Sequence, residues 1–88
     1  MECQKQFVSS IHDPEYQMIV NALIQLRETK KVSQAEIARA IGLTQPDVSK
    51  IERKERRIDI LEVLRWIRYT KTNPAEFFAQ FSNLENQA

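Results

Sequence analysis

The sequence predicts an all-α fold, and three observations support this prediction. The 88 residues include one glycine and three prolines, which leaves little room for the turns of β-hairpins. Apolar residues recur at helical spacing in several segments. Each of these segments begins with a polar residue of the kind that caps a helix, and most have an acidic residue three positions later. The capping signals and the apolar periodicity agree on five helices.

The first helix is predicted to begin after Asp13, with Pro14 at a position where the missing N–H of proline costs little. Lys30 and Lys31 lie in or just beyond its last turn, where positive charge is favourable to the helix dipole. Its apolar stripe consists of Tyr16, Ile19, Val20, Leu23, Ile24 and Leu26.

A second, short helix is expected at about residues 34–41. Ser33 and Glu36 have the spacing of a capping box, in which each side chain bonds to the backbone of the other residue. Gly42, the only glycine, stands where a left-handed residue ends one helix and allows a sharp turn into the next.

A third helix is expected at about residues 45–53. Thr44 and Asp47 repeat the capping-box spacing, and Pro46 lies in the first turn. Two short helices joined by a tight glycine turn predict a helix-turn-helix, whose second helix can enter the major groove of DNA.

The fourth and fifth helices have the same kind of start signal. Asp59 with Glu62 predicts the start of the fourth, and Asn73 with Pro74 and Glu76 predicts the start of the fifth. Their expected apolar positions are Leu61, Leu64 and Ile67 in the fourth helix, and Phe77, Phe78 and Phe81 in the fifth.

The composition is typical of a single globular domain, with 42% hydrophobic and 28% charged residues. We expect an N-terminal arm at residues 1–12, the helical domain at 13–82 and a frayed tail at 83–88. The lone Cys3 cannot form an internal disulfide, and we find neither a signal peptide nor an apolar run that could span a membrane. These features predict a cytoplasmic protein.

The net charge of +1 is by itself poor evidence for a nucleic-acid partner, so the distribution of charge matters more. Residues 50–57 contain five basic and two acidic side chains, a local charge of +3. This basic cluster begins in the last turn of the third helix and continues beyond its end; its basic members are Lys50, Arg53, Lys54, Arg56 and Arg57.

Residues 23–81 resemble the Cro/C1-type (XRE-like) helix-turn-helix transcriptional regulators, a family with a five-helix, lambda-repressor-like fold. The motifs behind the resemblance are Ser33-Gln34, Glu36-Ile37-Ala38, Ile41-Gly42, Gln45, Val48-Ser49-Lys50-Ile51-Glu52 and Arg56-Arg57. The segment 10–16 also resembles the leader of small bacterial regulators of this type. The resemblance implies a sequence-specific regulator of transcription that binds double-stranded DNA, with repressor as our preferred role, and that forms a homodimer through its C-terminal region.

Base contacts are expected from one exposed face of the third helix, opposite Val48 and Ile51. A glutamine amide can pair with adenine, a lysine can donate to guanine or neutralise a phosphate, and a proline can touch a thymine methyl. The candidate base-contact residues are Gln45, Pro46, Ser49 and Lys50. Asp47 could accept from cytosine, but its spacing from Thr44 favours the capping role.

Phosphate contacts position a protein on DNA without reading its sequence. The candidates lie at the start of the two short helices, on the exposed side of the first of them and in the basic cluster: Ser33, Gln34, Arg39, Thr44, Arg53, Lys54, Arg56 and Arg57. The resemblance implies that Gln34 holds a phosphate and braces Gln45. For the glutamines and the basic cluster alike, the alternative is an ordinary solvated surface.

Glu52 would repel DNA if it were exposed. The resemblance implies instead that it forms a structural ion pair with Arg27 in the first helix. The resemblance also implies glycine or asparagine at position 54, where this chain has lysine. A left-handed lysine is unfavourable, so the sequence predicts either a different loop or a longer helix there.

Catalysis is not predicted. His12 is the only histidine and Cys3 the only cysteine, and a single glycine cannot form a glycine-rich phosphate loop, so we expect neither an enzyme nor a cofactor or metal site. The aromatic residues of the fourth and fifth helices are expected mostly in the core, with some surface left for a partner: Trp66, Tyr69, Phe77, Phe78 and Phe81.

Two further roles stay open within the DNA-binding hypothesis. The chain could regulate a prophage, or it could be an antitoxin with a cognate toxin as a second partner. The alternative from another class is a helical protein–protein interaction module that has this fold but does not bind DNA, and the low overall charge favours it.

Overall fold

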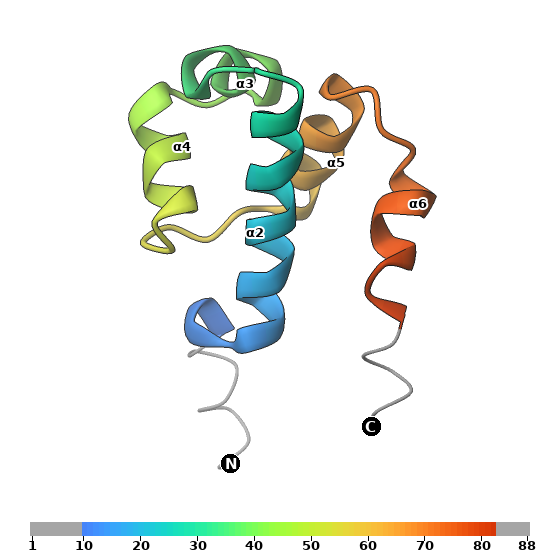
Figure 1. Ribbon diagram of the computed structural model, residues 1–88. Coiled ribbons are helices and arrows are strands. Elements are labelled where there is room, and N and C mark those ends of the chain that lie inside the picture. Colours follow the sequence, from blue (N-terminus) through green and yellow to red (C-terminus); the bar gives the residue numbers. More distant parts are fainter. Residues whose placement is uncertain (1–9, 83–88) are drawn as a thin grey trace.

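The computed structural model describes residues 10–82, which contain five α-helices and no strand (Figure 1). The elements are η1 (Ser10–His12), α2 (Pro14–Thr29), α3 (Gln34–Ile41), α4 (Gln45–Glu52), α5 (Ile60–Tyr69) and α6 (Pro74–Ala79). The all-α prediction is confirmed. A short 3-10 helix occupies the end of the segment expected to be an arm, and the rest of that arm, Cys3 included, and the tail at 83–88 lie outside the described residues.

The core is built from the inward faces of α2, α3, α4 and α5, with one contribution from α6. At its centre the fully buried Trp66 donates from Nε1 to the backbone oxygen of Leu23 at 2.9 Å, which satisfies the one polar group that this ring buries. Burying apolar side chains from four helices in one cluster holds α3 and α4 in a fixed mutual arrangement.

The buried face of α5 differs from the predicted one. Val63, Trp66 and Ile67 are buried, whereas Leu61 is 47% exposed and Leu64 is only partly buried. Apolar residues, tyrosine included, occupy seven of the ten positions of α5, so periodicity alone does not select one stripe.

Every predicted N-cap forms, but not every predicted capping box. Asp13, Thr44, Asp59 and Asn73 each accept a backbone N–H from the first turn of the following helix. Ser33 does the same for α3, with its Oγ 3.0 Å from the backbone nitrogen of Glu36. The box expected there is only half formed, because the carboxylate of Glu36 accepts from the hydroxyl of Tyr69 instead of from the backbone of Ser33.

The helices α2 to α5 are each followed by a left-handed residue, and three of these four residues are lysines. Gly42 has φ of 86°, as predicted, while Lys31, Lys54 and Lys71 have φ of 60°, 63° and 61°. After α4 the nitrogen of Glu55 donates to the oxygen of Lys50 at 2.8 Å, which is the long bond of a Schellman motif. The prediction that position 54 would avoid this conformation was wrong, because the capping bonds compensate for the strain.

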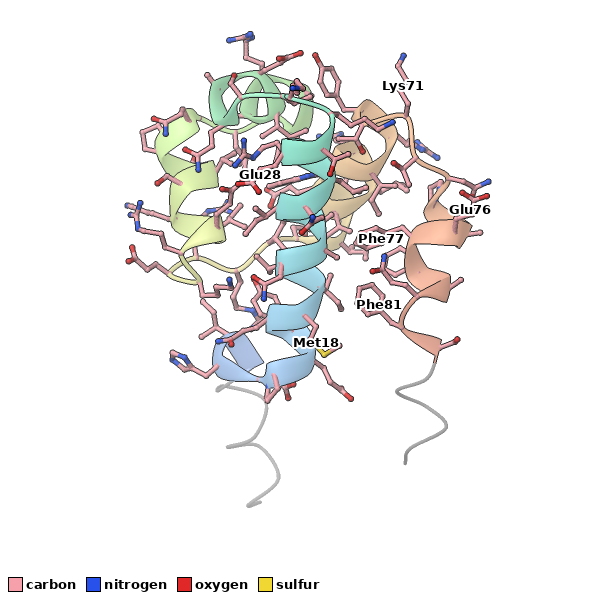
Figure 2. All side chains as sticks on the ribbon, in the orientation of Figure 1. Met18, Glu28, Lys71, Glu76, Phe77 and Phe81 are labelled. Atoms are coloured by element: carbon pink, nitrogen blue, oxygen red, sulfur yellow. The ribbon has the colours of Figure 1, made fainter. Side chains whose placement is uncertain are left out.

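The aromatic residues of α6 divide between core and surface. Figure 2 shows Phe77 of α6 and Phe81, just beyond the end of α6, pointing toward the body of the protein, and Phe77 is buried. Phe78 is 41% exposed, although its ring meets that of Phe77 edge-on with centroids 5.2 Å apart. Some aromatic surface therefore stays available, as expected.

Candidate nucleic-acid interface

Helix α4 buries one side and presents the other. Val48 and Ile51 are fully buried against the core. On the opposite side Gln45, Pro46 and Lys50 are exposed. This arrangement leaves the side chains considered for base contact free to meet a partner, with Ser49 partly buried at their edge.

The first turn of α4 is fixed by a complete capping box. Thr44 Oγ1 accepts from the backbone nitrogen of Asp47 at 3.3 Å, and Asp47 Oδ2 accepts from both the nitrogen and the hydroxyl of Thr44 at 3.2 and 2.9 Å. The bonds from Thr44 lower the pKa of the Asp47 carboxyl below its usual value. Asp47 thus occupies the capping position that its spacing predicts.

A chain of polar side chains joins α2, α3 and α4. Arg27 Nε and Nη2 donate to the two carboxylate oxygens of Glu52 at 2.7 and 3.0 Å, which is a bidentate ion pair. Glu52 Oε1 also accepts from Gln34 Nε2 at 2.8 Å. Gln34 Oε1 in turn accepts from Gln45 Nε2 at 2.8 Å.

We call Arg27, Glu52, Gln34 and Gln45 the four-residue network. It runs from partly buried to exposed, because the side chains of Arg27 and Glu52 are 12% and 9% exposed whereas Gln45 lies at the surface. The backbone oxygen of Val32 accepts from Arg27 Nη1 at 2.9 Å and completes the buried end. The network limits the side-chain freedom of the glutamine at the start of α4.

The basic cluster is partly neutralised by neighbouring acids. Arg53 donates from Nε and Nη2 to the carboxylate of Glu55 at 3.2 and 3.1 Å, and also to the hydroxyl of Ser49. The hydrogen bonds between Arg53 and Glu55 raise the pKa of Arg53 and lower that of Glu55. Arg56 donates to Glu62 at a longer 3.4 Å.

Other members of the cluster have no acidic partner within residues 10–82. Arg57 is exposed and forms no ion pair there, and Lys50 is exposed as well. Lys54 Nζ donates to the neutral Asn21 Oδ1 at 2.5 Å, so its charge is retained. The cluster therefore stays positive beside the exposed face of α4.

Two contacts that position the end of α4 and the following loop were not predicted from the sequence. Tyr16 Oη accepts from the backbone nitrogen of Ile58 at 3.0 Å and ties the loop after the basic cluster to α2. The bond from Lys54 to Asn21 ties the end of α4 to the same helix. The residues of each pair are 42 and 33 positions apart, and no local pattern indicates such a pairing.

The remaining phosphate candidates lie at the start of α3 and of α4, apart from Arg39, which lies in the last turn of α3. Ser33, Arg39 and Thr44 are exposed, and Gln34 is half-buried within the four-residue network. The first backbone N–H groups of α3 have no partner inside the helix apart from the Ser33 cap, which gives that end a partial positive charge.

The arrangement has the features of a DNA-binding protein: an exposed short helix, a glutamine fixed at its start and basic side chains beyond its end. A family model described as helix-turn-helix matches residues 23–77, and the chain belongs to this Cro/C1-type helix-turn-helix family of DNA-binding regulators. Its all-helical structure is a small lambda-repressor-like fold. No curated protein matches the chain.

Two further findings concern the described residues alone. Residues 10–82 contain no group of three or more histidine, cysteine, aspartate or glutamate side chains that could hold a metal ion. None of the helices in this range has both the length and the apolar character needed to cross a membrane.

Proposed function

We propose that this protein is a sequence-specific regulator of transcription, acting as a repressor, and that its homodimer inserts α4 of each copy into the major groove of a palindromic operator. The observation that supports this proposal most directly is the exposed Gln45, braced by the four-residue network at the start of α4. We assign the DNA-binding domain to residues 13–82.

The hydrogen-bond inventory of Gln45 is compatible with adenine. Its amide nitrogen has two hydrogens, of which one is donated to Gln34. The second hydrogen can reach adenine N7 while Oε1 accepts from N6, which is the bidentate pairing that distinguishes adenine in the major groove. By the same count, Gln34 has one amide hydrogen left for a phosphate after donating to Glu52.

Phosphate contacts are proposed on both sides of α4. On one side are the start of α3 and the exposed residues Ser33, Arg39 and Thr44. On the other side is the basic cluster, in which Arg57 has no acidic partner among residues 10–82. Contacts on both sides would set the depth of α4 in the groove, and the base edges would supply specificity.

A homodimer would place the two copies of α4 about 34 Å apart, one turn of DNA. Exposed apolar side chains that a second copy could cover occur at the start of α5 and on α6: Ile60 is 72% exposed, Leu61 47% and Phe78 41%. Covering such side chains is favourable, which supports association.

The test is a gel shift of the full chain on duplexes from the promoter region upstream of its own gene, at two salt concentrations. Specific retention that weakens as salt rises is expected, with a mobility that corresponds to two copies per operator. A chain that ignores every duplex even in dilute buffer would instead be the protein-interaction module. The neighbouring gene then distinguishes a prophage regulator from an antitoxin.

A further inference from the structure

An open groove lies between the end of α2, one side of α3 and the end of α5. Its volume is about 620 Å³. Val32 and Ala40 provide half-buried apolar surface, and Tyr69, which is 40% exposed, provides an aromatic ring. The groove includes no residue of α4 and no member of the four-residue network or the basic cluster.

The lining of this groove is strongly positive. Four cations line it, and none of them forms an ion pair in the part of the chain that the structure describes: Lys30, Arg65, Arg68 and Lys71. All four are exposed, and Figure 2 shows Lys71 extending away from the body of the protein. The only acid in the lining is Glu36, which accepts from the hydroxyl of Tyr69, so the formal charge of the lining is +3.

The negative ends of nearby helix dipoles offset part of this positive charge but not all of it. The helices α2, α3 and α5 all end at or near the groove, and Nη1 of Arg65 lies 3.5 Å from the position of a Cβ at Gly42, the C-cap of α3. Each helix C-terminus contributes about −0.5 of an elementary charge, so three of them offset about half of the lining charge. The lining therefore keeps a net positive charge beside its apolar surface.

We propose that this groove binds an acidic, extended peptide segment of a protein partner, in which glutamate or aspartate alternates with apolar residues. In an extended chain successive side chains point to opposite sides, so the carboxylates can meet the cations while the apolar side chains cover Val32, Ala40 and the ring of Tyr69. The open shape suits a peptide better than a small molecule, which proteins usually enclose.

The proposal does not depend on DNA binding, because α4 and its basic cluster lie outside the groove. A partner bound there would still act close to the helix-turn-helix. The hydrogen bond between Tyr69 and Glu36 links the end of α5 to α3, so an occupant of the groove contacts a residue of the first helix of that motif.

The probe for the test is a short blocked peptide that alternates glutamate with valine, labelled for fluorescence anisotropy and titrated into the full chain. Two exposed arginines of the groove are replaced in Arg65→Gln/Arg68→Gln, and two exposed arginines of the basic cluster are replaced in the matched control Arg53→Gln/Arg57→Gln. The groove variant should bind about fivefold more weakly, as expected for the loss of two exposed charge contacts, and the control should be unchanged. Far-ultraviolet circular dichroism establishes that both variants are folded.

Glu36→Gln gives a result of opposite sign. It removes the only negative charge of the lining and retains an acceptor for Tyr69, so the peptide should bind more tightly. Amide shifts in NMR should concentrate at Val32, Ala40 and Thr70. Equal weakening in the control variant, no binding at all, or full displacement by free glutamate at the same carboxylate concentration would overturn the proposal.

Discussion

Replacing Glu52 by glutamine should destabilise the fold far more than a surface substitution does. Glu52 Oε1 and Oε2 accept from two nitrogens of Arg27, and Oε1 also accepts from Gln34. In Glu52→Gln one carboxylate oxygen becomes an NH₂ group that faces a guanidinium donor. Arg27, whose side chain is 12% exposed, then keeps only Glu28 as an acidic partner, at 3.8 Å from its Nη2, and because the Glu28 side chain is 64% exposed it replaces little of the lost interaction.

The magnitude follows from this burial. Removing one partner of a buried ion pair costs about 3–5 kcal/mol, because the other charge stays desolvated and unpaired. In a domain of this size each kcal/mol corresponds to about 4–8 °C in Tm, so the lower bound predicts a fall of at least about 12 °C. The loss is a large fraction of the total stability of about 5–15 kcal/mol that is usual for folded proteins.

The assay is urea unfolding of each variant, followed by circular dichroism and by the fluorescence of the buried Trp66. Glu55→Gln is the matched control, because its ion pair with Arg53 spans 3.1 Å but the two side chains are 55% and 53% exposed. The control should lose less than about 1 kcal/mol.

A double variant separates the interaction from the loss of each side chain. Arg27→Met/Glu52→Met removes both charges and leaves apolar groups of similar length. The double variant should therefore be more stable than Arg27→Met alone or Glu52→Met alone. If the two single losses simply add in the double variant, or if Glu52→Gln costs no more than Glu55→Gln, the ion pair between Arg27 and Glu52 does not stabilise the fold.

Three further predictions follow from particular residues. The pKa of Asp47 in the folded protein lies below its ordinary value of 3.8, so the stability that the ionised carboxylate contributes is fully present above pH 3.8 and is lost as the pH falls through the folded pKa. In Asp47→Asn the loss of stability below about pH 4 should therefore be smaller than in the unsubstituted protein. Chemical unfolding at a series of pH values measures this difference. Lys31→Gly should raise the free energy of unfolding by about 0.5–1 kcal/mol, because glycine adopts its φ of 60° without strain; an unchanged urea midpoint would refute this. Gln45→Ala should relax the preference for one base, whereas Arg57→Ala should weaken all duplexes alike and reduce the salt slope by about one, and binding titrations on substituted operators distinguish the two outcomes.

The sequence predicts what depends on residues close to one another in the chain. The capping bonds of Ser33 and Thr44 join positions three apart, so spacing alone indicates them, and the structure contains both. Gly42 ends α3 with φ of 86° for the same local reason. The start of each helix and the turn between α3 and α4 were therefore predictable.

The sequence does not predict what depends on how the helices pack. Glu36 has the correct spacing for a capping box, yet Tyr69, 33 residues away, takes its carboxylate. In α5 the consecutive apolar pair Val63 and Leu64 is compatible with two different buried faces, and only the position of α2 and α3 selects the face that includes Val63. The bond between Lys54 and Asn21 depends in the same way on where α4 ends relative to α2.

The four-residue network couples the structural role of Glu52 to the recognition role proposed for Gln45. Glu52 is the counter-ion of Arg27 and also the acceptor that orients Gln34, and Gln34 orients Gln45. A substitution at Glu52 should therefore change both stability and base preference, whereas Gln45→Ala should change base preference alone, because Gln45 is exposed. Comparing the two variants at a temperature where both are fully folded tests whether the buried ion pair acts on recognition through the orientation of the two glutamines.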